Sequence, residues 1–236
     1  MKFIGKCLLI EEANKKVLVF GDLHLGYGGS LRNSGVMVPA IVGKQMVEES
    51  RNVFEKVGKV EEIVLVGDVK HEFGSILQEE REEMNMVVNY LLEWCEKLVI
   101  IRGNHDKILP NIVRGEGIEV RDYYVWRDYC FLHGDKDFEE IYDKKINTWV
   151  MGHSHPAITL REAAKAEKYK CFLVGKFKGK KVVIMPSFFP FNEGTDPRDY
   201  DVGLACEFDF DNFEVMIVGD DLEVLNFGLM KKLKDY

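Results

Sequence analysis

The sequence lacks several features that would assign a protein to the membrane, secreted or disulfide-rich classes. No apolar run approaches the ~20 residues that a membrane-spanning helix needs, so none is expected. The amino-terminal segment has a short apolar stretch and no small-residue cleavage site, which does not fit a signal peptide. The few cysteines are odd in number and form no CxxC pair, which disfavours a disulfide framework or a structural zinc site and favours a reducing cytoplasm. They are Cys7, Cys95, Cys130, Cys171 and Cys206.

Nothing in the sequence divides the chain. It has no internal repeat, no low-complexity tract and no Pro/Gly-rich linker, so its 236 residues are expected to form a single domain. The net charge of -8 disfavours attraction of the whole surface to nucleic acid. Between Arg161 and Lys181, however, eight Lys or Arg residues stand against two Glu. Such a run is usually a solvated face and gains interest only beside a site that handles phosphate.

Short apolar runs alternate with segments of helical period, which indicates an α/β fold. Helices are predicted from Ala40 to Val57 and along the apolar stripe from Met84 to Cys95. Strands are predicted at Phe3–Ile10, Val17–Phe20, Ile63–Val66 and Leu98–Ile101, and after residue 117 in the segments 117–135, 147–156, 169–188 and 202–219. The part of the chain before residue 117 is thus predicted to be α/β, and the part after it mostly β. One mixed fold, with two facing β-sheets flanked by α-helices, accommodates both parts.

The histidines are concentrated in short segments that follow predicted strands. Those segments are "GDLHLG" (21–26), "GDVKHEFG" (67–74), "GNHD" (103–106), "LHGD" (132–135) and "GHSH" (152–155), and together they hold all six histidines. Loops at the carboxyl ends of parallel strands meet at one edge of a sheet. Carboxylates and imidazoles gathered there are costly to bury unless they bind cations. A single such segment is more often structural, but five in one chain favour a metal site.

The same segments, in this order, resemble the calcineurin-like metallophosphoesterases. The family pattern is matched by Asp22-Leu23-His24, Gly67-Asp68, Gly103-Asn104-His105-Asp106, His133 and Gly152-His153-Ser154-His155. The segments "DLHLGYGGSLRNSGVMVP" (22–39), "GDVKHEFG" and "MPSFFPFNEG" (185–194) are similar to the ICC-like branch, some of whose bacterial members are DNA-ligase-associated endonucleases. The resemblance implies a four-layer α/β sandwich. The short strand-like runs bounded by turns beyond these motifs predict that the carboxy-terminal residues complete its second sheet.

The resemblance also implies a set of roles. Asp22, His24 and His155 would bind one divalent ion, and Asn104, His133 and His153 a second. Asp68 would bridge the two ions together with a water or hydroxide that attacks phosphorus in line. His105 would contact the phosphate and protonate the leaving oxygen, and Asp106 would orient His105. A mixed His/Asp/Asn shell suits Mn²⁺, our first choice, or Fe, Zn, Co or Ni.

The substrate is expected to be a phosphodiester. The protein Ser/Thr phosphatases of the family carry an arginine soon after the bridging Asp, whereas this chain has "GDVKHEFG". Lys70 offers a point charge there but no bidentate fork. The alternatives are a phosphomonoesterase and, less favoured, a non-catalytic metal-binding scaffold. The sequence allows three roles for His71: an extra contact to phosphate, a partner of a metal ligand, or a hydrogen-bonded structural residue. The last is slightly favoured.

DNA or RNA is the natural first guess for the diester. The segment "GYGGSLRNSG" (26–35) reads as a loop at the rim of the site or as an ordinary connection, and its Arg32 is a candidate substrate contact together with Asn104 and His105. The Lys-rich segment 165–181 follows His155 and has Tyr and Phe interleaved, a composition that can bind nucleic acid or merely line a core. The sequence leaves the mode of cleavage and the oligomeric state open.

Overall fold

A computed structural model describes residues 1–37, 41–73, 76–109, 113, 117–162, 165–200 and 202–233. The predicted helix start at Ala40 lies outside these residues. No helix among them is long and apolar enough to cross a membrane.

The first sheet has six strands in the order β1-β2-β3-β4-β5-β6. They are β1 Lys2–Ile4, β2 Cys7–Glu12, β3 Lys15–Phe20, β4 Val60–Leu65, β5 Cys95–Ile101 and β6 Ile118–Arg121. β1 to β3 are antiparallel, and β3 to β6 are parallel. The predicted strand Phe3–Ile10 is wrong in one respect, because Gly5, with φ of 53°, turns the chain so that Ile4 pairs with Cys7.

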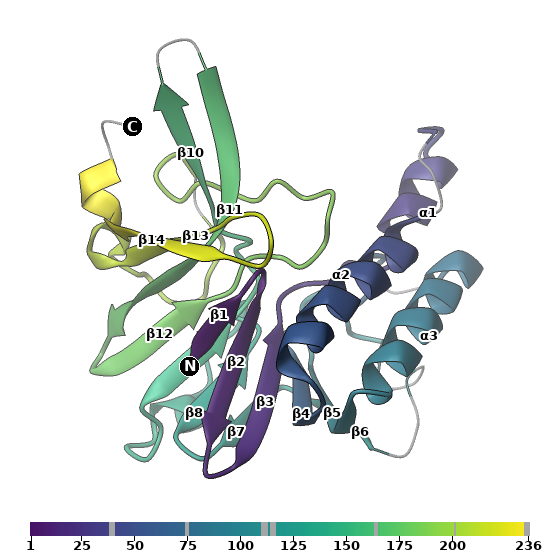
Figure 1. Ribbon diagram of the computed structural model, residues 1–236, viewed down its shortest axis with the longest axis horizontal. Coiled ribbons are helices and arrows are strands. Elements are labelled where there is room, and N and C mark those ends of the chain that lie inside the picture. Colours follow the sequence, from purple (N-terminus) through teal and green to yellow (C-terminus); the bar gives the residue numbers. More distant parts are fainter. Residues whose placement is uncertain are drawn as a thin grey trace.

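Three helices accompany this sheet: α1 Tyr27–Asn33, α2 Val42–Val57 and α3 Gln78–Leu92. α2 and α3 cover its outer face with their apolar stripes (Figure 1). The predicted stripe ran on to Cys95, but α3 ends at Leu92 and Cys95 begins β5. The loop expected at 26–35 is also wrong, since residues 27–33 are helical. Gly28 and Gly29 are buried there, and a Cβ on Gly29 would stand 3.0 Å from Glu79, so small residues let α1 approach α3.

The second sheet has the strand order β14-β13-β11-β12-β9-β8-β7, with β10 paired to β11. The strands are β7 Tyr123–Trp126, β8 Tyr129–Leu132, β9 Thr148–Met151, β10 Ala157–Glu162, β11 Lys165–Phe177, β12 Lys180–Ile184, β13 Glu214–Val218 and β14 Val224–Leu229. β8, β9 and β12 are parallel, and the other pairs are antiparallel. The carboxy-terminal strands β13 and β14 belong to this sheet, at the end next to β11.

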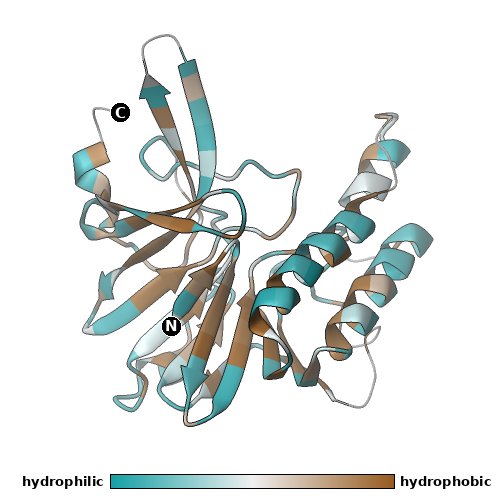
Figure 2. Ribbon diagram, in the orientation of Figure 1, coloured by the Kyte–Doolittle hydropathy of each residue, from teal (hydrophilic) through white to brown (hydrophobic). Residues whose placement is uncertain are grey.

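The two sheets pack face to face around a shared apolar layer, visible as brown strands in Figure 2. Val19, Val64 and Val99 of the first sheet meet Phe131, Val150 and Phe172 of the second. The outer face of the second sheet is covered, among the described residues, by the 3₁₀ turns η1 Glu139–Tyr142, η2 Phe210–Asn212 and η3 Met230–Leu233 and by loops. The predicted α/β sandwich of two mixed sheets is confirmed, and the long helices of the described residues lie on the side of the first sheet.

One predicted strand segment is mostly loop. Of residues 202–219, only Glu214–Val218 forms a strand. The alternating phenylalanines that suggested a strand instead form a cluster over the sheet, with the rings of Phe208 and Phe210 5.8 and 5.3 Å from that of Phe213. The alternation of apolar residues therefore correctly predicted that these side chains pack on the core, but it wrongly predicted that the backbone forms a strand.

Candidate metal centre

The residues singled out from the sequence meet at one edge of the sandwich. Asp22 and His24 follow β3, Asp68 follows β4, and Asn104 and His105 follow β5 of the first sheet. His133 follows β8 and His153 and His155 follow β9 of the second sheet. Because β3, β4 and β5 are parallel, as are β8 and β9, their carboxyl ends face the same side. The topology therefore explains how loops more than 130 residues apart, such as those of His24 and His155, come into contact.

Three groups of described side chains could each hold a metal ion, and Asp68 belongs to two of them. The first is Asp22, His24, Asp68 and His155, the second is Asp68, His133 and His153, and the third is His24, His71 and His105; within each, the donor atoms lie within 4.8 Å of one another. The two histidine Nε2 atoms of the first group are 3.2 Å apart. In the second, His133 Nε2 lies 3.4 Å from Asp68 Oδ2 and 3.1 Å from Asn104 Oδ1.

The chemistry of these donors fits divalent cations. Asp22, Asp68 and His133 are almost completely buried. Burial alone would raise the pKa of Asp22, but the charges of His155 and His133 hold it well below its ordinary value. Burial alone would likewise lower the pKa of His133, but its bond to Asp68 and the charge of Asp22 raise it to about 9. The negative charge of two buried carboxylates thus favours the protonated, positively charged form of a buried imidazole. A bound cation would compensate the same negative charge.

Hydrogen bonds to the backbone set the orientation of two imidazoles. His133 Nδ1 donates to the Val66 carbonyl at 2.9 Å, which leaves Nε2 facing Asp68. His153 Nε2 donates to the Gly203 carbonyl at 3.1 Å, which leaves Nδ1 facing His133 at 3.1 Å. Partners of this kind fix the nitrogen that a ligand presents to an ion. Sequence reasoning missed both, because main-chain carbonyls leave no motif.

Glycines bring the loops close enough for these contacts. A Cβ on Gly103 would lie 2.1 Å from Asp68 Oδ1, and one on Gly67 would lie 2.1 Å from His133 Nδ1. Gly67 also has a φ of 100°, which side-chain-bearing residues rarely adopt. At both positions the absence of a side chain lets the backbone lie against a residue of the site.

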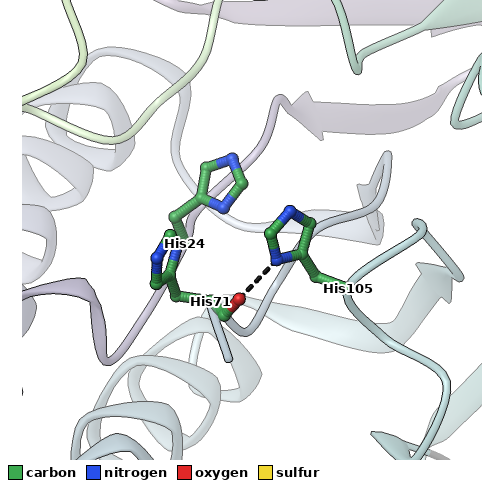
Figure 3. Close-up of side chains that lie close together, drawn as sticks. All are labelled: His24, His71 and His105. Carbon is green, nitrogen blue, oxygen red and sulfur yellow. Dashed lines mark hydrogen bonds between the residues drawn. The ribbon is translucent and has the colours of Figure 1, made fainter. Parts of the chain in front are cut away.

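His105 and Asp106 have partners that differ from the expected ones. His105 Nδ1 bonds the main-chain carbonyl of His71 (Figure 3), so its Nε2 faces Asp68 Oδ2 at 3.8 Å. The carboxylate of Asp106 accepts bonds from the backbone N–H groups of Val69, Lys70 and Gly103 instead. Asp106 therefore makes no hydrogen bond to the His105 ring among the described residues, and it would orient His105 through the backbone of its loop. Asp106 joins the loop after β4 to the loop after β5.

A cavity of about 340 Å³ opens beside the metal groups. It is lined by His24, Tyr27, His71, His105, His155, Phe189, Phe191, Asn192 and Glu193. The lining includes His71, whose buried Nδ1 has no hydrogen-bond partner among the described residues. The slightly favoured interpretation of His71 as a hydrogen-bonded structural residue is therefore wrong.

Asn192 was not predicted as a site residue. It contacts His155 Nδ1 at 2.7 Å. The "FNEG" segment, which carries Asn192 and Glu193, was the only sign of this contact in the sequence.

The predicted basic contacts lie elsewhere. Arg32 pairs with Glu79 of α3 and is not part of the cavity lining. Within the Lys-rich segment, Lys170 donates to the carbonyls of Ser187 and Phe189, and Lys180 donates to those of Asp143 and Ile146. These two lysines therefore bind main-chain carbonyls of neighbouring loops. Their charges do not contribute to an exposed basic face of the segment.

Comparisons with known proteins show which proteins this chain resembles. Among solved structures, the nuclease MPE of Pseudomonas putida shares the fold, with a TM-score of 0.60 and 16% identity over 94% of this chain and 100% of that one. Weaker likenesses are to the Escherichia coli phosphoesterase YfcE (TM-score 0.43, 14% identity, 90% and 98% covered) and to an archaeal phosphodiesterase (TM-score 0.40, 12% identity, 90% and 99% covered).

No curated protein matches the chain. Residues 15–221 match the calcineurin-like phosphoesterases, which is most of the chain and includes every segment of the metal site. The resemblance to the calcineurin-like family drawn from the motifs is thereby confirmed. The chain belongs to the calcineurin-like phosphoesterase family and is a phosphoric ester hydrolase.

Proposed function

We propose that the protein is a two-metal-dependent phosphodiesterase. The observation that carries this proposal is the membership of Asp68 in two neighbouring groups of donors, one with Asp22, His24 and His155 and one with His133 and His153. Asp22, His24 and His155 would hold one ion, Asn104, His133 and His153 the other, and Asp68 would touch both. When bound, two such ions lower the pKa of a water between them and neutralise charge on the phosphoryl group. The donor set favours Mn²⁺, with Fe, Zn, Co or Ni as alternatives.

The protein's own part in the reaction centres on His105. Its Nδ1 is engaged with the His71 carbonyl, so only Nε2 is free to carry a proton toward the cavity. A phosphodiester seated over the metal groups would place its leaving oxygen within reach of that nitrogen. An imidazole that donates a proton there would lower the barrier to P–O cleavage by general acid catalysis. Asn104, adjacent in the chain, would complete the contact to phosphate.

The charges around the cavity favour a diester over a monoester. Lys70 is completely buried, with its Nζ 3.6 Å from Glu80, and does not reach the cavity. The lining contains no Lys or Arg among the described residues, and it does contain Glu193. A dianionic monoester would therefore meet a carboxylate and no bidentate cation beyond the ions. A monoanionic diester fits this distribution better.

We further propose DNA or RNA as the source of the diester, a cytoplasmic location and a single domain. The shared fold of a protein named as a nuclease supports the first. Five unpaired cysteines support the second. The continuous apolar layer between the two sheets supports the third.

The test is hydrolysis of bis(p-nitrophenyl) phosphate by metal-stripped protein titrated with Mn²⁺. Wild type should release p-nitrophenolate only with metal, and Asp68→Asn should abolish the release because it weakens both ion sites. Asp196→Asn is the matched control. It also removes a buried carboxylate charge, but one that pairs with Arg198 and belongs to none of the groups that could hold a metal ion.

Two results would contradict the proposal. If metal-loaded wild type cleaves p-nitrophenyl phosphate and leaves the diester intact, the protein is a phosphomonoesterase. If it cleaves neither ester while binding two ions, the centre is a non-catalytic scaffold. Loss of activity in Asp196→Asn to the same degree as in Asp68→Asn would show general damage to the fold.

A further inference from the structure

Aromatic rings form a continuous belt along the wall of the cavity. The ring of Tyr27 lies 4.6 Å from that of His71 and 5.1 Å from that of Phe189, measured between centroids. Phe189 in turn contacts Phe191 at 5.9 Å. These rings come from α1, from the loop after β4 and from the "FFPF" segment after β12, so three separate parts of the chain contribute to one surface.

Two further observations show that this belt is open to a ligand. Phe191 lines the cavity and is 53% exposed. Phe73 is 60% exposed and its ring lies 3.8 Å from that of His105, at an interplanar angle of 32°. Large aromatic side chains at these exposures cost free energy unless something covers them. Both stand beside the residues that would handle the phosphate, and not on a remote face.

The charges of the cavity indicate what could cover the rings. A strand gripped through several phosphates requires Lys or Arg along its path, and the described lining offers none. Stacking needs only a planar face, and every nucleobase has one. Bases in a duplex are already stacked on one another, so only an unpaired base is available.

We propose that Tyr27, Phe189 and Phe191, which line the cavity, form a stacking subsite for an unpaired nucleobase next to the scissile phosphodiester, and that Phe73, whose ring lies against His105, extends this subsite. This inference rests on the proposed function and narrows its substrate to nucleotides with unpaired bases, in single strands or as small diesters. The metal centre would hold the phosphate, and the belt would hold the base. A duplex would be excluded at the same subsite.

A binding experiment without metal tests this subsite independently of catalysis. A single-stranded pentanucleotide with a central 2-aminopurine is titrated with the full-length protein in the presence of a chelator, which prevents hydrolysis. The same strand in a duplex and an abasic pentamer, as a competitor, give the two comparisons. The two variants, called the cavity variants below, are Phe191→Leu, in the lining of the cavity, and Phe73→Leu, beside the His105 that lines it. The matched control is Phe227→Leu, an exposed phenylalanine of β14 outside the cavity.

We expect the protein to quench the single strand, with the duplex quenched little and the abasic pentamer competing poorly. Each cavity variant should weaken binding by about tenfold, in the range of one base–aromatic stack, and Phe227→Leu should match wild type. A 2-aminopurine nucleotide methyl diester that binds as well as the pentamer would support the subsite and assign recognition to the single base.

Equal binding of single strand and duplex, no quenching by wild type, or unchanged binding in both cavity variants would overturn the inference. Hydrolysis of bis(p-nitrophenyl) phosphate is measured with Mn²⁺ on the same preparations. Failure of that hydrolysis would count against the proposed function alone.

Discussion

Replacing Asp106 by alanine should destabilise the metal-free protein by about 3 kcal/mol or more. Its carboxylate is completely buried and accepts N–H bonds from Val69 at 3.2 Å, Lys70 at 3.1 Å and Gly103 at 3.0 Å. Alanine leaves these three donors without a partner, and each buried orphan costs about 1–3 kcal/mol. Even the lower value for each gives a total near 3 kcal/mol, roughly a hundredfold in the ratio of folded to unfolded protein.

Urea unfolding in the presence of a chelator measures this loss. Because burial raises the pKa of Asp106 to about 6, the measurement belongs at pH 8, where the carboxylate is ionised. Asp106→Asn keeps one carbonyl oxygen as an acceptor and should lose less than Asp106→Ala. Asp122→Ala, which removes a partly exposed carboxylate paired with Arg102, should lose under ~1 kcal/mol.

The reasoning would be refuted if Asp106→Ala lost no more stability than Asp122→Ala. A second refuting result concerns catalysis. If Asp106 acted through the His105 ring, its removal would change the pH dependence of diester hydrolysis as His105→Asn does. We expect Asp106→Asn to lower activity without moving that profile, because His71 supplies the ring's partner.

The remaining predictions concern the glycine beside the bridging residue and a buried lysine. Gly103→Ala should lower Mn²⁺ affinity at least tenfold in a chelator competition assay, because its Cβ would stand 2.1 Å from Asp68 Oδ1; unchanged affinity would show that the loop moves freely. Burial, followed by repulsion from Lys6, lowers the pKa of Lys170 from 10.5 to about 7. Between those values the unfolded chain binds more protons, so wild-type stability should rise with pH from 7 toward 10, by up to ~1.4 kcal/mol per unit relative to Lys170→Met. Parallel stability–pH curves for the two proteins would contradict this assignment.

The sequence predicted the position of the metal centre because that position depends on strand order and little else. Asp22, Asp68 and His133 each follow an apolar run, and the carboxyl ends of parallel strands meet whatever the details of the loops. The same logic predicted the two mixed sheets. Element ends were less predictable, since Cys95 continues the helical stripe in sequence yet begins a strand.

Other features could not be predicted, because they depend on contacts between parts of the chain that carry no pattern. The partner of His105 is a main-chain carbonyl, and every residue has one. Lys170 belongs to a run of charge that resembles a solvated face, yet its Nζ donates to two carbonyls of the "SFF" segment. The charge of Arg32 suggested a contact to substrate. In the structure this charge is paired with Glu79, which lies on another helix, and the sequence gives no sign of that pairing.

The backbone at the metal centre provides a last prediction about strain. Four of the expected ligands, His24, Asp68, His153 and His155, have φ between 44° and 68°, a region that costs a side-chain-bearing residue about 1–3 kcal/mol. Glycine does not incur this cost, although elsewhere in a folded chain it is usually less stable than alanine. Under chelation, His153→Gly should therefore be more stable than His153→Ala, by about 1 kcal/mol in urea unfolding. Ordinary selection for stability would place glycine at such positions. Retention of histidine and aspartate there is explained if binding of ions offsets the strain, and alanine equal to or better than glycine at residue 153 would remove that explanation.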